Sequence, residues 1–238
     1  MRLIVSDLDG TLLLKGESTL HRLTESAIGR LIDGNTVFCV ASGRNYGELK
    51  RIMKDFDGEV YFIAHDGALI VYKEKSIFEA PIEKALLKGF DGEESLVAHG
   101  KYLSFVKSGS KRFIREIKAQ YLGHIAEIDS IDDINEPIYK VTVYGKKDCG
   151  CSLNKVYCGH TSCEYVANGI NKGRAVAELS KILKTDNVIA IGDGINDAEM
   201  LKSAAKAYVI ASAPPRVKKL GTDIVKEFKD AVDDLSEG

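Results

Sequence analysis

The sequence lacks any long hydrophobic run: no stretch of its 238 residues approaches the roughly 20 consecutive apolar residues of a transmembrane helix. The apolar run before Ser6 is only three residues long, so the start of the chain also lacks the apolar core of a secretory signal peptide. Basic stretches with interleaved aromatic residues are absent, and the net charge is −2, which disfavours nucleic acid as a partner. We therefore expect a cytoplasmic protein that binds neither membranes nor nucleic acid.

The chain has five cysteines, and this odd count fits a reducing compartment better than a disulfide framework. Four cysteines and one histidine nevertheless fall close together, so a zinc site is an alternative. Their spacing lacks the paired two-residue knuckles of such sites, and we expect the cysteines on predicted strands to act as small hydrophobic residues. The five residues are Cys149, Cys151, Cys158, His160 and Cys163.

With 45% hydrophobic and 29% charged residues, the chain can bury a substantial core. Apolar runs of strand length occur at residues 3–6, 36–41, 60–64, 188–191 and 208–210. Continuous apolar strands that alternate with amphipathic helices predict a parallel sheet covered on both faces, which is a doubly wound α/β domain. The predicted helical faces are Leu23, Ala27, Ile28 and Leu31; Leu49, Ile52, Met53 and Phe56; and Ala175, Val176, Leu179, Ile182 and Leu183.

The middle of the chain follows a different pattern, in which strand pairs and short helices replace the alternation of strand and helix. Strands are predicted at 94–98, 101–107, 139–144, 153–158 and 162–166, with a helix at 111–121. We therefore expect an α+β domain at residues 81–168, inserted into an α/β core domain formed by residues 1–80 and 169–238.

Two aspartates leave the first predicted strand together. Side chains two residues apart in an extended chain point to the same side, so Asp7 and Asp9 should lie next to each other, and Gly10 lets the chain turn at once. Neighbouring carboxylates repel each other, which indicates a bound cation, a shared proton or both. The alternative is an ordinary turn rich in Asp and Gly, where Asp serves local hydrogen bonding.

Further polar residues follow other predicted strands, at the sheet edge where doubly wound folds bind ligands. Asp193, with Asp7, offers hard carboxylate oxygens for Mg²⁺. Ser42 and the Gly43 N–H lie at a strand-to-helix turn and can donate to phosphate oxygens. Lys172, at another predicted helix start, adds a positive charge.

Asn196 and Asp197 follow Asp193 by three and four residues, so both can reach back toward the ion if a helix begins at Asn196. A carboxylate nucleophile, an acid/base group, a metal and a cationic clamp together form a phosphoryl-transfer site. A carboxylate is a poor nucleophile toward a charged phosphate, and Mg²⁺ relieves that repulsion.

Four short motifs resemble those of a known enzyme family: DLDGTL at 7–12, ASGR at 41–44, NKG at 171–173 and GDGIND at 192–197. The chain resembles the haloacid dehalogenase superfamily, in its Cof-like phosphatase branch. The match covers the whole α/β domain, with the four motifs in order. The inserted middle is similar to the small α+β cap of archaeal-type phosphoglycolate phosphatases, sucrose phosphatase and phosphomannomutase.

The resemblance implies roles for the acidic residues. Asp7 would be the nucleophile that forms an aspartyl-phosphate, which splits a difficult displacement into two steps. Asp9 would protonate the leaving alcohol and then activate water. Asp7, the Asp9 carbonyl and Asp193 would ligate Mg²⁺, with Asp197 close to the metal directly or through water.

The resemblance also implies roles for neighbouring residues. Ser42 and Lys172 would bind the phosphoryl oxygens, and Asn196 would lie near the phosphate. The family branch usually has Asn before the Gly-Ala that follows the third strand, whereas this chain has Asp66. An acceptor-only carboxylate there replaces an amide that also donates.

We therefore expect a Mg²⁺-dependent phosphatase for small phosphorylated metabolites, either sugar phosphates or phosphoglycolate-like acids. A phosphomutase or phosphotransferase that passes the phosphoryl group to a sugar is an alternative. A signalling domain with Asp7 as phospho-acceptor is another, although it would need neither Asp9 as acid/base nor an inserted cap. A basic run in the cap indicates a solvated helix face, with a clamp for an anionic substrate tail as the alternative: Lys107, Lys111, Arg112 and Arg115.

Overall fold

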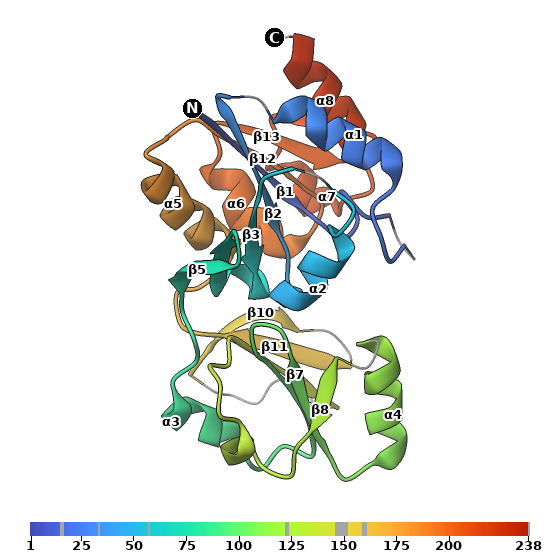
Figure 1. Ribbon diagram of the computed structural model, residues 1–238, viewed down its shortest axis with the longest axis vertical. Coiled ribbons are helices and arrows are strands. Elements are labelled where there is room, and N and C mark those ends of the chain that lie inside the picture. The colour runs from blue at the N-terminus through green and yellow to red at the C-terminus, as the bar shows by residue number, and fades with distance from the viewer. Residues whose placement is uncertain are drawn as a thin grey trace.

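Two lobes, each built on one sheet, make up the protein (Figure 1). The computed structural model describes residues 1–14, 17–32, 34–56, 58–121, 124–145, 152–158 and 161–237. The larger lobe holds an eight-stranded sheet and contains both ends of the chain, and the smaller lobe holds a six-stranded sheet. In the described parts of the chain, no helix is long and apolar enough to cross a membrane.

The larger sheet is parallel over six strands and antiparallel at one edge. In sheet order its strands are β14 (Asp223–Val225), β13 (Lys206–Ile210), β12 (Val188–Gly192), β1 (Arg2–Asp7), β2 (Thr36–Ala41), β3 (Val60–Ala64), β4 (Leu69–Tyr72) and β5 (Lys75–Glu79). The chain reverses the direction of sheet growth between β1 and β12, which makes this pair the switch point where such folds bind ligands. The predicted doubly wound α/β fold is confirmed.

Helices cover both faces of this sheet, because alternate side chains of its strands point to opposite sides. Leu3 and Val5 on β1 pack with α5, α6 and α7, whereas Ile4 packs with α1, α2 and α8. Each fully buried aliphatic side chain contributes about 1.5–3 kcal/mol to folding. These helices are α1 (Arg22–Leu31), α2 (Tyr46–Ile52), α5 (Lys172–Leu183), α6 (Ala198–Ser203), α7 (Pro215–Lys218) and α8 (Phe228–Glu237).

Two residues assigned to buried helical faces are exposed in the structure. Leu23 is 67% exposed, because α1 starts at Arg22 and only its later turns meet the sheet, and Ile182 is 47% exposed at the end of α5. The hairpin of β4 and β5 was not predicted. Its turn residues Lys73 and Glu74 both have positive φ, 47° and 67°, which sequences usually mark with Asn or Gly.

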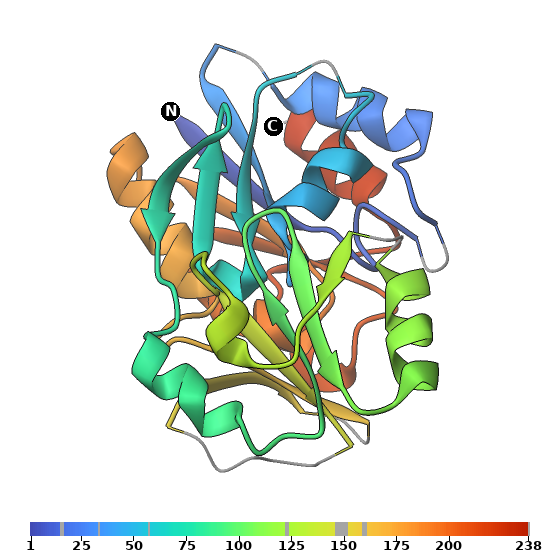
Figure 2. The same cartoon turned by 60° about the horizontal axis from the view of Figure 1, so that its bottom comes forward.

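The smaller sheet is mixed, with β7 and β8 parallel and the other pairs antiparallel. In sheet order its strands are β10 (Asn154–Cys158), β11 (Ser162–Val166), β9 (Lys140–Tyr144), β6 (Ser95–His99), β7 (Ser104–Ser108) and β8 (Ile125–Glu127). Helices α3 (Lys84–Leu87) and α4 (Lys111–Gln120) lie on opposite sides of this lobe (Figure 2). All its strands fall within the predicted insertion, whose boundaries at 81 and 168 stay a prediction.

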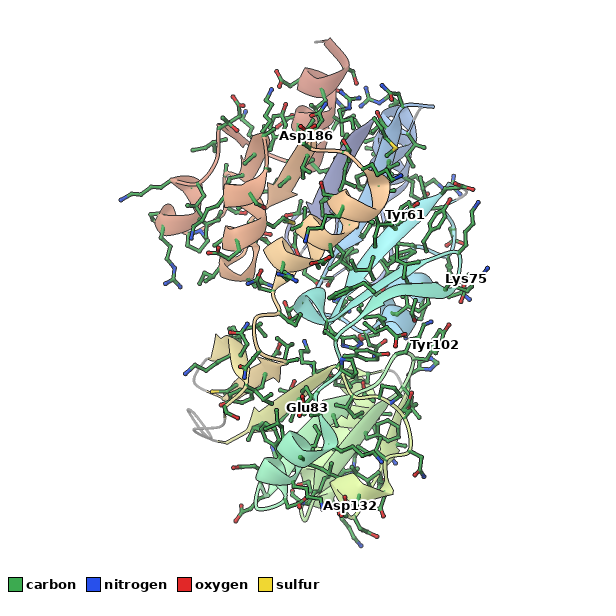
Figure 3. The ribbon with its side chains drawn as sticks, turned by 90° about the vertical axis from the view of Figure 1, so that its left-hand side faces the viewer. Tyr61, Lys75, Glu83, Tyr102, Asp132 and Asp186 are labelled. Carbon is green, nitrogen blue, oxygen red and sulfur yellow. The ribbon has the colours of Figure 1, made fainter. Side chains whose placement is uncertain are left out.

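The lobes meet through aromatic and polar contacts beside the connection between them. Tyr102, which lies between the lobes in Figure 3, packs edge-on against Tyr46 with ring centroids 5.5 Å apart. Its hydroxyl donates to Glu74 Oε2 at 3.2 Å. Asn45 Nδ2 donates to Ser104 Oγ at 3.3 Å on the smaller sheet. These contacts hold the smaller sheet over the carboxyl ends of the parallel strands.

The cysteine cluster is only partly described. Cys149, Cys151 and His160 lie outside the described residues, as does the side chain of Cys158, so the zinc alternative stays a prediction there. Cys163 is buried in β11 and is disulfide-bonded, so the expectation of a small hydrophobic thiol at this position is wrong.

Candidate active site

Three carboxylates gather where β1 and β12 end. Asp7 is the last residue of β1, and Asp193 and Asp197 follow β12 directly, with Asp197 at the end of a short 3₁₀ turn. One oxygen from each carboxylate lies within 4.8 Å of the other two. The adjacent parallel strands bring these residues together across more than 180 positions of sequence, as the strand-end pattern predicts.

Lys172, the first residue of α5, lies fully buried among these carboxylates. Its Nζ donates to Asp7 Oδ1 and, at 2.7 Å, to Asp197 Oδ1. Burial lowers the pKa of Lys172, but Asp197 and Asp7 outweigh this effect and raise it above its usual value, so the ammonium stays charged. The buried lysine therefore neutralises part of the carboxylate charge.

The carboxylates retain a surplus of negative charge. Burial raises the pKa of Asp7 well above its usual range, and the Asp197 carboxylate raises it further. Burial also raises the pKa of Asp193. One lysine cannot neutralise three carboxylates, so a divalent cation would balance the remaining negative charge. The carboxylate oxygens are hard donors of the kind that Mg²⁺ prefers. The residues present therefore fit Mg²⁺.

The turn after β1 is shaped around Asp193. Gly10 has φ +95°, and a Cβ at this position would lie 2.5 Å from Asp193 Oδ2. Any side chain here would be strained and would collide with the carboxylate. Thr11 Oγ1 donates to Asp193 Oδ1 at 2.9 Å, which orients the same group. The first motif thus supplies both Asp7 and the packing that fixes Asp193.

Asp9 points to a different partner. Arg44 donates two hydrogen bonds to the Asp9 carboxylate, from Nε to Oδ2 at 2.8 Å and from Nη2 to Oδ1 at 2.7 Å. A bidentate pair of this kind has fixed geometry, and hydrogen bonding to Asp9 raises the pKa of Arg44. The Asp9 carboxylate is half-exposed and is not part of the three-carboxylate cluster.

The predicted phosphate-binding residues lie beside this cluster. Ser42 is buried at the end of β2, and its Oγ accepts from Arg44 N at 3.2 Å. Gly43 packs so tightly that a Cβ would lie 2.9 Å from Asp66 Oδ2. Asn196 Nδ2 donates to Asp66 Oδ1 at 2.9 Å. Asp66 therefore connects the turn after β2 with the turn after β12.

A cavity of about 720 Å³ opens above these groups and is lined by both lobes. Asp7, Asp9, Ser42, Gly43 and Asn196 line it, whereas Lys172 and Asp197 are fully buried beneath its floor. None of the four basic residues Lys107, Lys111, Arg112 and Arg115 of the smaller lobe lines it. The smaller lobe contributes His99, Gln120, Tyr121, Lys140, Val156, Tyr157 and Glu164.

A family model for haloacid dehalogenase-like hydrolases matches residues 4–232. The chain belongs to the haloacid dehalogenase-like hydrolase family. The predicted resemblance is therefore confirmed, as is the prediction that the protein is a hydrolase of this family. The roles of individual residues stay predictions.

Individual relatives of this hydrolase agree with the family assignment. The chain is 24% identical over 234 residues to the 5-amino-6-(5-phospho-D-ribitylamino)uracil phosphatase of Escherichia coli K12, covering 90% of this chain and 86% of the relative. It is 25% identical over 237 residues to the HMP-PP phosphatase of Escherichia coli O157:H7, covering 91% and 86%. A solved structure from Eubacterium rectale matches with a TM-score of 0.87 and 22% identity, covering 99% of both chains.

Sequence reasoning assigned no role to several residues of this hydrolase's site. Arg44 and Thr11 lie inside the recognised motifs, and the charge of Arg44 next to a predicted phosphate-binding turn was a usable signal. Lys140 and Glu164 come from the smaller sheet. The sequence signal for the burial of Lys140 was its position at the start of a strand whose other residues are apolar or β-branched.

Proposed function

We propose that this hydrolase is a Mg²⁺-dependent phosphatase for small phosphorylated metabolites. The observation that supports the proposal is the arrangement of Asp193, Asp197 and Lys172 around Asp7, which lines a cavity between the two lobes. The phosphatase names of its relatives support the same reaction class. One relative acts on a phosphorylated ribityl compound, which favours sugar-phosphate-like substrates among the predicted ones.

In the proposed reaction, an Asp7 oxygen attacks phosphorus and forms an aspartyl-phosphate as the bond to the leaving oxygen breaks. Asp9 donates its proton to that leaving alcohol. Asp9 then takes a proton from water, whose oxygen attacks phosphorus and breaks the bond to Asp7, which releases inorganic phosphate. The Lys172 ammonium and the Ser42 and Gly43 turn stabilise the phosphoryl oxygens throughout.

Asp7, Asp193, Asp197 and the Asp9 carbonyl would hold Mg²⁺. The bound ion would neutralise the phosphate charge and so reduce its repulsion of the Asp7 carboxylate. The smaller lobe would act as a cap that excludes water and selects the leaving group. In this proposal residues 81–168 form the cap, and residues 1–80 and 169–238 form the catalytic core.

A panel of phosphorylated metabolites, assayed for phosphate release with MgCl₂ and with a chelator, tests the proposal. We expect release that needs Mg²⁺ and that Asp7→Asn abolishes. Asp186→Asn is the matched control, because Asp186 is an exposed aspartate at the end of the larger lobe away from the cavity (Figure 3). Undiminished release by Asp7→Asn would refute the mechanism.

Product analysis in the same assay separates the alternatives. A phosphomutase would isomerise its substrate without releasing phosphate, and a phospho-acceptor domain would accumulate a long-lived phosphoprotein without turnover. Either result would replace the hydrolytic assignment while leaving the role of Asp7 as phosphoryl acceptor in place.

A further inference from the structure

A buried lysine of the smaller lobe reaches into the catalytic face of the larger lobe. Lys140 is the first residue of β9, and its side chain is only 7% exposed. Its Nζ donates to the Gly43 carbonyl at 2.5 Å and lies 3.4 Å from Asp66 Oδ2. A third contact, to Glu164 Oε2 at 2.9 Å, comes from the neighbouring strand β11.

Burying this ammonium is costly unless it is paired, because removal from water must be offset by charge and hydrogen bonds. The smaller lobe supplies only Glu164 among the three contacts. Asp66 and Gly43 belong to the larger lobe, so the full set of contacts forms only when the two lobes are seated together. Burial lowers the pKa of Lys140, but Asp66 and Glu164 outweigh it and raise the pKa, which keeps the lysine charged.

The two residues that Lys140 contacts in the larger lobe are tied to the phosphate-binding turns. Asp66 N donates to the Ser42 carbonyl at 3.0 Å, and Asp66 Oδ1 accepts from Asn196 Nδ2 at 2.9 Å. Asp66 holds this position with φ 54°, in the left-handed region. A displacement of Asp66 or Gly43 would therefore move Ser42 and Asn196 with it.

The carboxylate at position 66 fits this arrangement better than an amide would. Its two oxygens face two donors, Lys140 Nζ on one side and Asn196 Nδ2 on the other. An Asn here would offer one oxygen and would turn its NH₂ group toward one of these donors. Lys140 and Asp66 are thus chemically matched across the boundary between the lobes.

We propose that Lys140 is a positioning residue that couples seating of the smaller lobe to the shape of the phosphate-binding turns, with Asp66 as its matched partner. The proposal rests on the proposed function for its catalytic consequence. Its structural part is that Lys140 orders residues 42–44 and 66 across the lobe boundary, and this part does not depend on catalytic activity.

The test compares the wild-type protein with Lys140→Met, Asp66→Asn and the double variant. Affinity for inorganic phosphate in MgCl₂ is measured by calorimetry, and kcat and KM are measured with p-nitrophenyl phosphate. We expect each single variant to lose about tenfold or more in phosphate affinity, the scale of one hydrogen bond to a charged group. The double variant should lose no more than the worse single variant, because both changes remove the same contact.

Lys107→Met is the matched control, since Lys107 is a smaller-lobe lysine whose Nζ donates to the Asp91 and Glu93 carbonyls away from the cavity. It should keep wild-type phosphate affinity. Equal behaviour of Lys140→Met and Lys107→Met would overturn the proposal, as would losses that multiply in the double variant.

Hydrogen–deuterium exchange without substrate separates this inference from the proposed function. Lys140→Met should speed exchange in residues 42–47 and 64–68 but leave α8 unchanged. If the wild-type protein neither binds phosphate nor hydrolyses any compound, the proposed function fails while the exchange result still decides the role of Lys140. Unchanged exchange in both segments would overturn it even in an active phosphatase. Should Lys140→Met fail to fold, the isosteric Asp66→Asn carries the same measurements.

Discussion

Replacing Lys172 by Met should destabilise the protein in a way that depends on Mg²⁺. Lys172 is fully buried and donates to Asp7 and Asp197. The substitution keeps the length of the side chain but leaves three carboxylates without their lysine. Removing one partner of a buried ion pair typically costs about 3–5 kcal/mol.

This cost converts to a measurable change in melting temperature. In chains of about this size, 1 kcal/mol shifts the melting temperature by about 2–4 °C, so the variant should melt about 6–20 °C lower in a chelator. A cation that binds only the folded state adds stability in proportion to its affinity. Because the Lys172→Met site has one more unbalanced negative charge, MgCl₂ should stabilise the variant by a larger increment than the wild type.

Thermal unfolding of the wild type, Lys172→Met and a control variant, each with a chelator and with excess MgCl₂, supplies the six melting temperatures needed. Lys202→Met is the control, because Lys202 forms an exposed ion pair with Glu199 at 2.7 Å, and such pairs contribute about 1 kcal/mol or less. Two results would refute the reasoning: a Lys172→Met protein as stable as Lys202→Met in the chelator, or an equal Mg²⁺ increment in both variants.

Urea titrations check two further predictions. Burial lowers the pKa of His65 to about 3 from 6.5, so its neutral ring favours folding above pH 6.5 and that contribution is lost as the pH falls toward 3. Lowering the pH from about 7.5 to about 5 should therefore reduce the free energy of unfolding of the wild type by about 2 kcal/mol. His65→Asn should not show this loss, and Asn tolerates the left-handed φ of 52° at this position. Equal pH dependence of the two proteins would contradict the prediction. Gly67→Ala should cost more than about 2 kcal/mol, because Gly67 has φ +111° and a Cβ would lie 2.3 Å from the Asn171 carbonyl oxygen. Gly29→Ala, in open space on α1, should instead stabilise by about 0.5–1 kcal/mol, and a wild-type midpoint for Gly67→Ala would refute the packing.

The core of the site could be predicted because its geometry follows from sheet topology. Apolar runs identified β1, β2 and β12 closely, and parallel strands end at one edge, so the residues after them had to meet. Asp7, Asp193 and Lys172 are far apart in sequence but needed no knowledge of side-chain packing to be placed together. Their exact partners, such as the bond between Thr11 and Asp193, depended on packing and could not be read from the strand pattern.

The smaller lobe could be predicted as strands and helices but not as a binding surface. The periodicity of β9 shows which residues are buried, yet it does not show which strand of the lobe faces the larger sheet. The pairing of Arg44 with Asp9 was hidden for a related reason, because both charges lie in turns whose directions depend on φ values. The hairpin at Lys73 and Glu74 lacked a glycine signal altogether.

Asp66 departs from the family pattern, and the reason for this departure is visible only in its contacts with residues elsewhere in the chain. From the sequence, a carboxylate in place of the usual Asn removed a donor and gave no reason for the change. In the structure, the lost donor would have faced either Lys140 or Asn196, both of which are donors themselves. The two oxygens of the carboxylate instead join one residue from each lobe. The identity of residue 66 is therefore explained by the lobe it faces rather than by the lobe to which it belongs.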